Sequence, residues 1–229
     1  MSDKYVVIVA GGKGTRMGGD LPKQYVQLHD KPVLMHSIDQ FAHSKSAPRI
    51  IIVLHEDMLD YWQHLCRQYN YKTKHEVVTG GTSRFQSVRN GLTYIFDNYP
   101  TADLIAIHDG ARPIISTSLI DEAYLQTDRY GATVLAIPAT NSIRQGGPHK
   151  NSALNRNLLW QIQTPQTFKT ALLKGAFQQE ESPLFTDDAS VVEAHGHTIH
   201  LISGDYRNIK ITYPEDLQIA QIYIQANWD

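Results

Sequence analysis

The sequence predicts an α/β fold: a Rossmann-like, mostly parallel sheet flanked by helices, with a small protruding β-arm for dimerisation. Short apolar runs typical of buried strands alternate with longer amphipathic stretches of helical length. This alternation predicts right-handed βαβ units and a sheet whose ligands bind at the carboxyl ends of its strands. We expect the whole chain, residues 1–229, to form a single domain.

Each expected element follows from its own pattern. Apolar runs predict buried strands over residues 5–10, 50–54, 103–108 and 132–137. Amphipathic stretches predict helices near residues 33–41, 57–69, 83–96 and 116–130. Beyond residue 160 the pattern predicts a further helix, a strand over 198–202, and a last helix with Pro214 in its first turn.

Residues 138–160 interrupt the alternation. The segment is polar and carries a turn signal at Gly146-Gly147-Pro148. A polar segment of this length with a central turn predicts an inserted hairpin that protrudes from the sheet. The alternative is a mobile surface loop.

The composition is that of a soluble protein and narrows the classes of function. Hydrophobic residues make up 41% and charged residues 19%, and 21 Lys and Arg oppose 23 Asp and Glu, a net charge of −2. This balance argues against a broad basic face for nucleic acid. Cys66 is the only cysteine, which excludes an intrachain disulfide and fits a reducing compartment. The first apolar run is too brief for a membrane span, so we expect a cytoplasmic protein with no nucleic-acid or membrane partner.

A glycine-rich loop, residues 11–19, follows the first predicted strand directly. Glycines allow close backbone approach and point N–H groups at phosphate oxygens. The loop is not a P-loop, because no G-K-[ST] stands at the required spacing. It is not a dinucleotide fingerprint either, because Met17 stands at the place of the last glycine, so an NAD-dependent oxidoreductase is disfavoured. Arg16 lies within this loop and Lys23 follows it, and the two cations could converge on one polyphosphate. The alternative is a glycine turn with two solvated cations.

Charged residues stand at two further positions where buried strands are expected. Asp109 directly follows a predicted strand, where an α/β site expects a functional carboxylate, although it could also cap a helix. Lys210 lies inside an apolar run, and burying an unpaired ammonium is costly. A bound phosphate would satisfy Lys210; the alternative is that its side chain extends to solvent. The pair Asp187-Asp188 is explained as well by a helix N-terminus, which favours negative charge.

Six motifs follow one another along nearly the whole chain. They comprise residues 10–17 with 22–25, then 80–88, 108–113, 163–166, 186–190 and 208–212. In these motifs the chain resembles the family of 2-C-methyl-D-erythritol 4-phosphate cytidylyltransferases, to which ribitol-5-phosphate cytidylyltransferases are related. The resemblance implies transfer of CMP from CTP to 2-C-methyl-D-erythritol 4-phosphate with release of pyrophosphate, a step of non-mevalonate isoprenoid precursor synthesis.

The resemblance also implies roles for individual residues. The nucleotide-binding residues would be Ala10, Gly11, Gly12, Gly14, Gly80, Gly81, Thr82 and Ser87. The catalytic residues would be Arg16, Lys23 and Lys210. The acceptor-binding residues would be Asp109, Arg112, Ser142, Arg156 and Thr164. Mg²⁺ or another divalent cation would be carried by the CTP phosphates, with Asp109 as a further candidate ligand.

The resemblance further implies a homodimer with shared active sites. The arm would project into the neighbouring subunit, so that Ser142 and Arg156 serve the partner's site. Asn141-Ser142 stands where the family usually has Asp-Thr, which keeps the hydroxyl and loses a carboxylate. Because these residues would face the acceptor, ribitol 5-phosphate is the alternative acceptor. An alternative of another class is a non-catalytic nucleotide-binding or scaffold protein, against which the intact charged residues argue.

Overall fold

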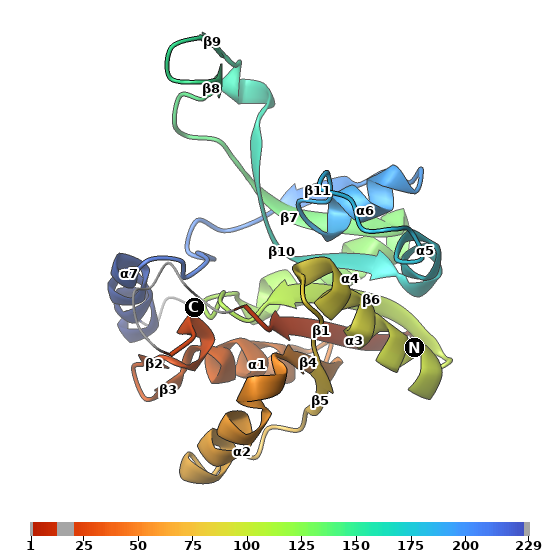
Figure 1. Cartoon of the computed structure of the whole chain (residues 1–229), viewed down its shortest axis with the longest axis vertical. Helices are drawn as coiled ribbons and strands as arrows, with labels where there is room; N and C mark the ends of the chain where they lie inside the picture. Colours follow the sequence, from red (N-terminus) through yellow and green to blue (C-terminus); the bar gives the residue numbers. More distant parts are fainter. Residues whose placement is uncertain (1, 13–20, 227–229) are drawn as a thin grey trace.

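The computed structural model describes residues 2–12 and 21–226, and it confirms the predicted Rossmann-like α/β fold (Figure 1). At its centre is a seven-stranded sheet in the order β11-β7-β10-β6-β1-β4-β5. The strands are β1 (Asp3–Ala10), β4 (Arg49–Leu54), β5 (Glu76–Thr79), β6 (Ala102–Asp109), β7 (Ala132–Pro138), β10 (Trp160–Lys169) and β11 (His200–Ser203). Neighbouring strands in this order are parallel, except that β10 is antiparallel to both β6 and β7.

Strand β10 is an element that the sequence pattern did not predict. The helix expected beyond residue 160 is present as α5 (Thr170–Ala176), but the strand Trp160–Lys169 precedes it. The buried side chains of Gln163, Thr164 and Gln166 are polar and make hydrogen bonds. Hydrophobic periodicity could not reveal a strand with so many polar side chains at its buried positions.

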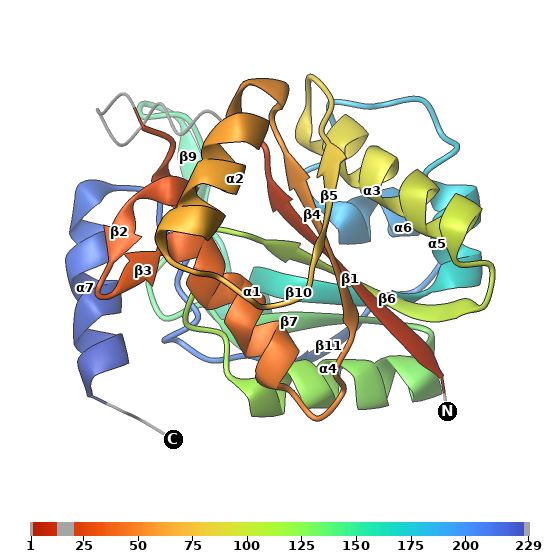
Figure 2. The ribbon, with the colours of Figure 1, turned by 90° about the horizontal axis from the view of Figure 1, so that it is seen from below.

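Helices cover both faces of the sheet, because successive strand residues point to opposite faces. On one face Val6 and Ile8 pack with α1 (Val33–His43), α2 (Leu59–Gln68) and α4 (Thr117–Tyr130). On the other face Tyr5 and Val7 pack with α3 (Arg84–Asn98), α5 and α6 (Asp188–Ala194). Figure 2 shows these three helices on the same side of the sheet. Each helix within residues 2–12 and 21–226 is too short or too polar to cross a membrane.

The last helix, α7 (Pro214–Gln225), lies beside the sheet rather than on it. It begins at Pro214 as predicted. It packs against the small hairpin of β2 (Gln27–Leu28) and β3 (Lys31–Pro32), through a cluster that includes Leu28, Ile211 and Ala220. The segment just before α7 thereby brings Lys210 to the same pocket as Gly11 and Gly12, which follow β1.

The arm, residues 138–160, leaves the body of the protein between β7 and β10 (Figure 1). Within it β8 (Arg144–Gly146) pairs antiparallel with β9 (Asn151–Ala153). The 3₁₀ turn η4 (Arg156–Leu158) leads back to the sheet. Leu158 is 75% exposed and Trp160 is 45% exposed.

Candidate active site

Two adjoining pockets lie at the carboxyl end of the sheet, where ligands of α/β folds bind. The larger pocket has a volume of about 480 Å³ and the smaller one about 280 Å³. Arg84, Asp109 and Lys210 line both of them. The two pockets therefore meet at these three charged side chains, which we call the junction.

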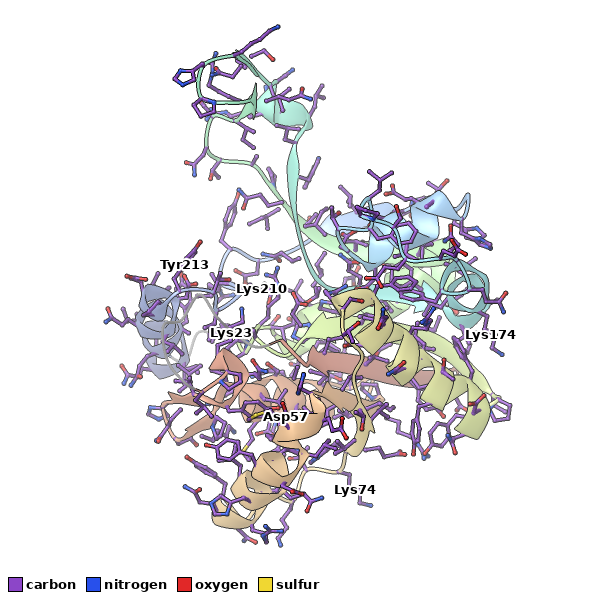
Figure 3. All side chains as sticks on the ribbon, viewed as in Figure 1. Lys23, Asp57, Lys74, Lys174, Lys210 and Tyr213 are labelled. Carbon is purple, nitrogen blue, oxygen red and sulfur yellow. The ribbon has the colours of Figure 1, made fainter. Side chains whose placement is uncertain are left out.

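The larger pocket gathers most of the predicted nucleotide-binding residues. Of the predicted residues, those that line it beside the junction are Ala10, Gly11, Gly12, Lys23, Gly81, Thr82 and Ser87. Gly14 and Arg16 lie outside the described residues. Figure 3 shows Lys23 and Lys210 on the same side of the molecule, and both face this pocket. Two cations above a backbone-lined wall suit a polyphosphate.

Ser87 and the glycines before it close one wall of the larger pocket. Ser87 Oγ accepts a hydrogen bond from the Gly81 N–H (3.1 Å) and donates one to the Ser83 carbonyl (2.8 Å). A Cβ atom at Gly80 would lie 2.9 Å from Ser87 Oγ, and one at Gly81 would overlap Gln86. Both glycines are thus required by packing at the start of α3. Gly80 supports this wall from behind, whereas Gly81 lines the pocket.

Gln24 is a site residue to which the sequence analysis gave no role. It is 3% exposed, and its Nε2 donates hydrogen bonds to the carbonyls of Ala10 (2.6 Å) and Gly12 (2.9 Å). These bonds tie the start of the glycine-rich loop to the 3₁₀ turn η2 (Lys23–Tyr25), which carries Lys23. The signal was present in the motif Pro22-Lys23-Gln24, but a neutral side chain beside a lysine gave no reason to single it out.

Asp109, the last residue of β6, lies among three cations. Its Oδ2 is 2.9 Å from Lys210 Nζ and 3.5 Å from Arg112 Nε, and its Oδ1 is 3.5 Å from Arg84 Nε. Burial alone would raise the pKa of Asp109, but the positive charges of these neighbours outweigh burial and hold the pKa well below its usual range. The carboxylate is therefore ionised, and the junction as a whole carries an excess of positive charge.

The segment that carries Lys210 is irregular backbone, not a strand of the sheet. Asn208 is fully buried and holds it in place: its Nδ2 donates to the Thr164 carbonyl (2.9 Å), and its carbonyl accepts from Arg112 Nη1 (2.8 Å). These bonds tie the segment to β10 and to the loop after β6. Lys210 stands in an apolar run because its ammonium group reaches Asp109, with 39% of the side chain exposed to the pockets.

Thr164, predicted to contact the acceptor, uses its hydroxyl inside the protein. Its Oγ1 accepts a hydrogen bond from the Asp109 N–H (3.0 Å) and lies 3.1 Å from His108 Nδ1. His108 Nε2 lies 3.1 Å from the Arg112 carbonyl, which can only accept, so Nε2 carries the ring proton. The Thr164 hydroxyl then donates to His108 Nδ1 and has no proton left for a phosphate. Thr164 lines the smaller pocket, yet these bonds give it a positioning role.

His108 makes the stability of the protein sensitive to acid. Burial, opposed only in part by the Asp109 charge, lowers the pKa of His108 from 6.5 to about 4. The unfolded chain takes up this proton as the pH falls below about 6.5 and the folded protein only near pH 4, so stability is lost as the pH falls through that window. We expect His108 to cost about 2 kcal/mol of unfolding free energy between pH 7 and pH 5. Urea unfolding at pH 7 and at pH 5 measures this difference. Between these two pH values, the unfolding free energy of His108→Asn should fall by about 2 kcal/mol less than that of the wild type. An equal loss in both proteins would contradict this assignment.

The smaller pocket contains part of the predicted acceptor site. Its lining includes Asp109, Arg112 and Thr164, with Gln166 and Asp187. Ser142 and Arg156 are exposed on the arm, and Arg156 Nη1 donates to the Thr140 carbonyl (2.8 Å). Neither of these arm residues lines the two described pockets of its own chain. The fold thus brings Asp109, Arg112 and Lys210 together and leaves the arm residues apart.

The carboxylates of the site fit a metal ion that arrives with a substrate. Among the described residues, no group of three or more His, Cys, Asp and Glu could hold a metal ion. Asp109 lines the larger pocket but is already paired with Lys210. Mg²⁺ commonly binds through substrate phosphates, one or two carboxylates and water. This donor set is compatible with a cation held by a triphosphate, with Asp109 as a candidate ligand.

Nearly the whole length of the chain is similar to one family of transferases. The family model of 2-C-methyl-D-erythritol 4-phosphate cytidylyltransferase matches residues 5–226. The chain is 44% identical to the 2-C-methyl-D-erythritol 4-phosphate cytidylyltransferase of Azobacteroides pseudotrichonymphae, over 98% of this chain and 100% of that protein. It is 42% identical to the enzyme of the same name from Phocaeicola vulgatus, over 97% of this chain and 100% of that protein.

The fold is similar as well. The structure superposes on that of 4-diphosphocytidyl-2C-methyl-D-erythritol synthase from Anaerococcus prevotii with a TM-score of 0.83 and 25% identity, over 98% of this chain and 96% of that one. The sequence match, the fold and the paired pockets at the carboxyl end of the sheet agree. The chain belongs to the 2-C-methyl-D-erythritol 4-phosphate cytidylyltransferase family.

Proposed function

We propose that the protein transfers CMP from CTP to the phosphate of 2-C-methyl-D-erythritol 4-phosphate and releases pyrophosphate. The observation that carries this proposal is the junction, where the larger and the smaller pocket meet at Arg84, Asp109 and Lys210. A nucleotide in the larger pocket and a phosphate in the smaller one would face each other across these charges. The two relatives described above are named for the same acceptor.

The reaction depends on positioning and charge more than on proton transfer. The acceptor phosphate is an anion at neutral pH, and one of its oxygens attacks the α-phosphorus of CTP. The new P–O bond forms as the bond from the α-phosphorus to the β-phosphate oxygen breaks, and pyrophosphate leaves with that electron pair. Lys23 and Lys210 face the phosphates and offset the repulsion between the two anions. Arg112, in the smaller pocket, adds positive charge on the acceptor side.

We expect Mg²⁺ or another divalent cation on the triphosphate, where it would neutralise charge on the phosphates. The compatibility of the site with a substrate-borne ion supports this part of the proposal. Omission of the cation from the assay should abolish turnover. The cytoplasmic location expected from the sequence stays a prediction.

Pyrophosphate release tests the proposed function. The protein is supplied with CTP and Mg²⁺, and with 2-C-methyl-D-erythritol 4-phosphate or ribitol 5-phosphate in parallel. We expect the first acceptor to give a kcat/KM higher by at least about 10²-fold. A preference for ribitol 5-phosphate would overturn the acceptor and would point to Asn141-Ser142 as the cause. Tight CTP binding without turnover of either acceptor would instead indicate a non-catalytic nucleotide-binding protein.

A homodimer with shared sites is the second part of the proposal. It is supported by the projecting arm, by the exposed Leu158 and Trp160, and by the separation of Ser142 and Arg156 from the pockets of their own chain. An arm that reached a neighbouring subunit would bury these apolar side chains and complete the acceptor side of the partner's site.

Mixing two inactive variants tests whether the sites are shared. Arg156→Ala impairs the arm and Lys210→Ala impairs the body of the chain, so each variant alone should be nearly inactive. In a mixed dimer, the body of the Arg156→Ala chain receives an intact arm, and one site in the dimer becomes whole. We expect activity to reappear after the two variants are unfolded together and refolded. If the mixture stays as inactive as the separate variants, or if the wild type is monomeric at assay concentration, the shared site is refuted.

A further inference from the structure

Arg84 is the third charged residue of the junction, beside Asp109 and Lys210. It is the first residue of α3, and its side chain, 33% exposed, lines both pockets at the junction. Its Nη1 and Nη2 donate to the two carboxylate oxygens of Asp188 at 2.8 and 2.7 Å, a bidentate pair. Asp188 is the first residue of α6, and its side chain is 2% exposed. The pair thus ties the helix behind the nucleotide pocket to the helix behind the acceptor pocket.

Helix stability does not account for this arrangement. A cation in the first turn of a helix opposes the helix dipole, so Arg84 is unfavourably placed for α3. The N-terminus of α6 is already capped by Asp187, which accepts from the Ser190 N–H (2.9 Å). A buried ion pair also adds little net stability over apolar packing, because both charges must be desolvated. The favourable position of Asp188 in the first turn of α6 does not require a bidentate pair with Arg84, so Asp188 does more than stabilise the start of its own helix.

Part of the hydrogen-bonding capacity of Arg84 is not used by Asp188. A guanidinium group carries five N–H donors. One donor on each terminal nitrogen is bound to Asp188, and Nε lies 3.5 Å from Asp109 Oδ1. The remaining donors, one on each terminal nitrogen, have no partner among the described residues. Because Arg84 lines both pockets, a phosphoryl group between the pockets is the anion within reach of these donors.

We propose that Arg84 is a further catalytic residue, which binds the α-phosphoryl group as it passes from one pocket to the other, and that Asp188 is its positioning residue. Asp188 fixes the plane of the guanidinium group and leaves the outer donors to the phosphate. Asp109 holds the Nε side of the same group, so the fork cannot rotate away from the junction. The role of Arg84 in turnover rests on the proposed cytidylyl transfer, whereas its contact with phosphate does not.

Conservative variants with a matched control test this inference. Arg84→Lys keeps the charge and removes the planar fork, and Asp188→Asn keeps the shape and removes the charge that orients it. Arg89→Lys is the control, since Arg89 lies exposed on the same helix. We expect Arg84→Lys to lower kcat about 30-fold and to raise the KM for CTP about tenfold, with little change in the KM for the acceptor, and Arg89→Lys to change none of the three. Because Asp188 acts through Arg84, the double variant should be no slower than Arg84→Lys alone.

Binding of CTP and of cytidine, measured by calorimetry without an acceptor, separates the phosphate contact from turnover. Arg84→Lys should weaken CTP about tenfold and leave cytidine unchanged, even if no acceptor were turned over. Equal kcat in Arg84→Lys and Arg89→Lys would overturn the catalytic role. A parallel loss of CTP and cytidine affinity, or fully additive losses in the double variant, would overturn the phosphate contact and the positioning by Asp188. Should Arg84→Lys not fold, Asp188→Asn decides: weaker CTP with unchanged cytidine supports the inference, and unchanged binding of both refutes it.

Discussion

Replacement of Lys210 by alanine is expected to lower kcat by about 10³-fold, the largest effect of any single substitution proposed for this protein. Lys210 lines both pockets, and its Nζ lies 2.9 Å from Asp109 Oδ2. Without Lys210 the junction loses one of the two cations that line both pockets, and the Asp109 carboxylate is left partly uncompensated next to two anions. Repulsion then rises most in the transition state, where the two phosphates are closest, so kcat should fall more than KM rises.

The matched control for Lys210 is Lys74→Ala. Lys74 is exposed and lies on a different part of the molecule from Lys210 (Figure 3). Steady-state kinetics of the two variants, with the unfolding temperature of each, separates loss of chemistry from loss of fold. Lys210→Arg should recover part of the rate, because it restores the charge. Retention of more than about half of the wild-type kcat in Lys210→Ala would remove Lys210 from the mechanism.

Replacement of Lys23 by alanine is expected to lower kcat/KM by about 10²-fold or more. Lys23 lines the larger pocket, beside the start of the glycine-rich loop that Gln24 holds through Ala10 and Gly12. A cation at this end of the pocket would act on the triphosphate, which gains charge on the departing pyrophosphate. The loss should therefore appear in CTP affinity and in kcat, while the affinity for cytidine stays the same.

Calorimetry with CTP and with cytidine, together with steady-state rates, checks the Lys23 prediction. Lys74→Ala again serves as the control, since it removes the same charge from an exposed position. An equal loss of CTP and cytidine affinity would mean that Lys23 shapes the pocket and does not bind phosphate. A normal rate in Lys23→Ala would remove it from the site.

Four of the parallel strands, β1, β4, β6 and β7, could be predicted because they are continuous apolar runs. Residues 5–10 and 50–54, for example, are buried on both faces by two helical layers, and such runs can be recognised without structural information. The parallel strand β5 was not predicted, because its residues alternate between half-buried and exposed positions. Strand β10 could not be predicted in this way. Its buried positions hold the polar residues Gln163, Thr164 and Gln166, whose hydrogen-bond partners lie far away in sequence.

The site residues that could be predicted are those with a local signal in the sequence. Lys23, Asp109 and Lys210 could be predicted, since glycine-rich loops, strand ends and charges in apolar runs are local signals. Gln24 and Arg84 received no role, because their function depends on contacts across the fold: Gln24 with Ala10, and Arg84 with Asp188 over a sequence separation of 104 residues. The helix N-terminus expected at Asp187-Asp188 is present, with Asp187 as the cap and Asp188 in the first turn of α6, but the ion pair of Asp188 with Arg84 was not predicted. Resemblance placed Thr164 at the acceptor, and only the hydrogen bonds show that its hydroxyl is engaged by His108.

Transfer of the cytidylyl group to the acceptor phosphate at the junction can be followed directly by ³¹P NMR of the products. The protein is incubated with CTP, Mg²⁺ and 2-C-methyl-D-erythritol 4-phosphate until the reaction ends. We predict that the triphosphate resonances give way to free pyrophosphate and, in equal molar amount, to two mutually coupled resonances of a new diphosphate ester. Formation of CMP in place of that ester would show hydrolysis without transfer, and unchanged CTP would show no reaction. Either of these results would contradict the proposed transfer.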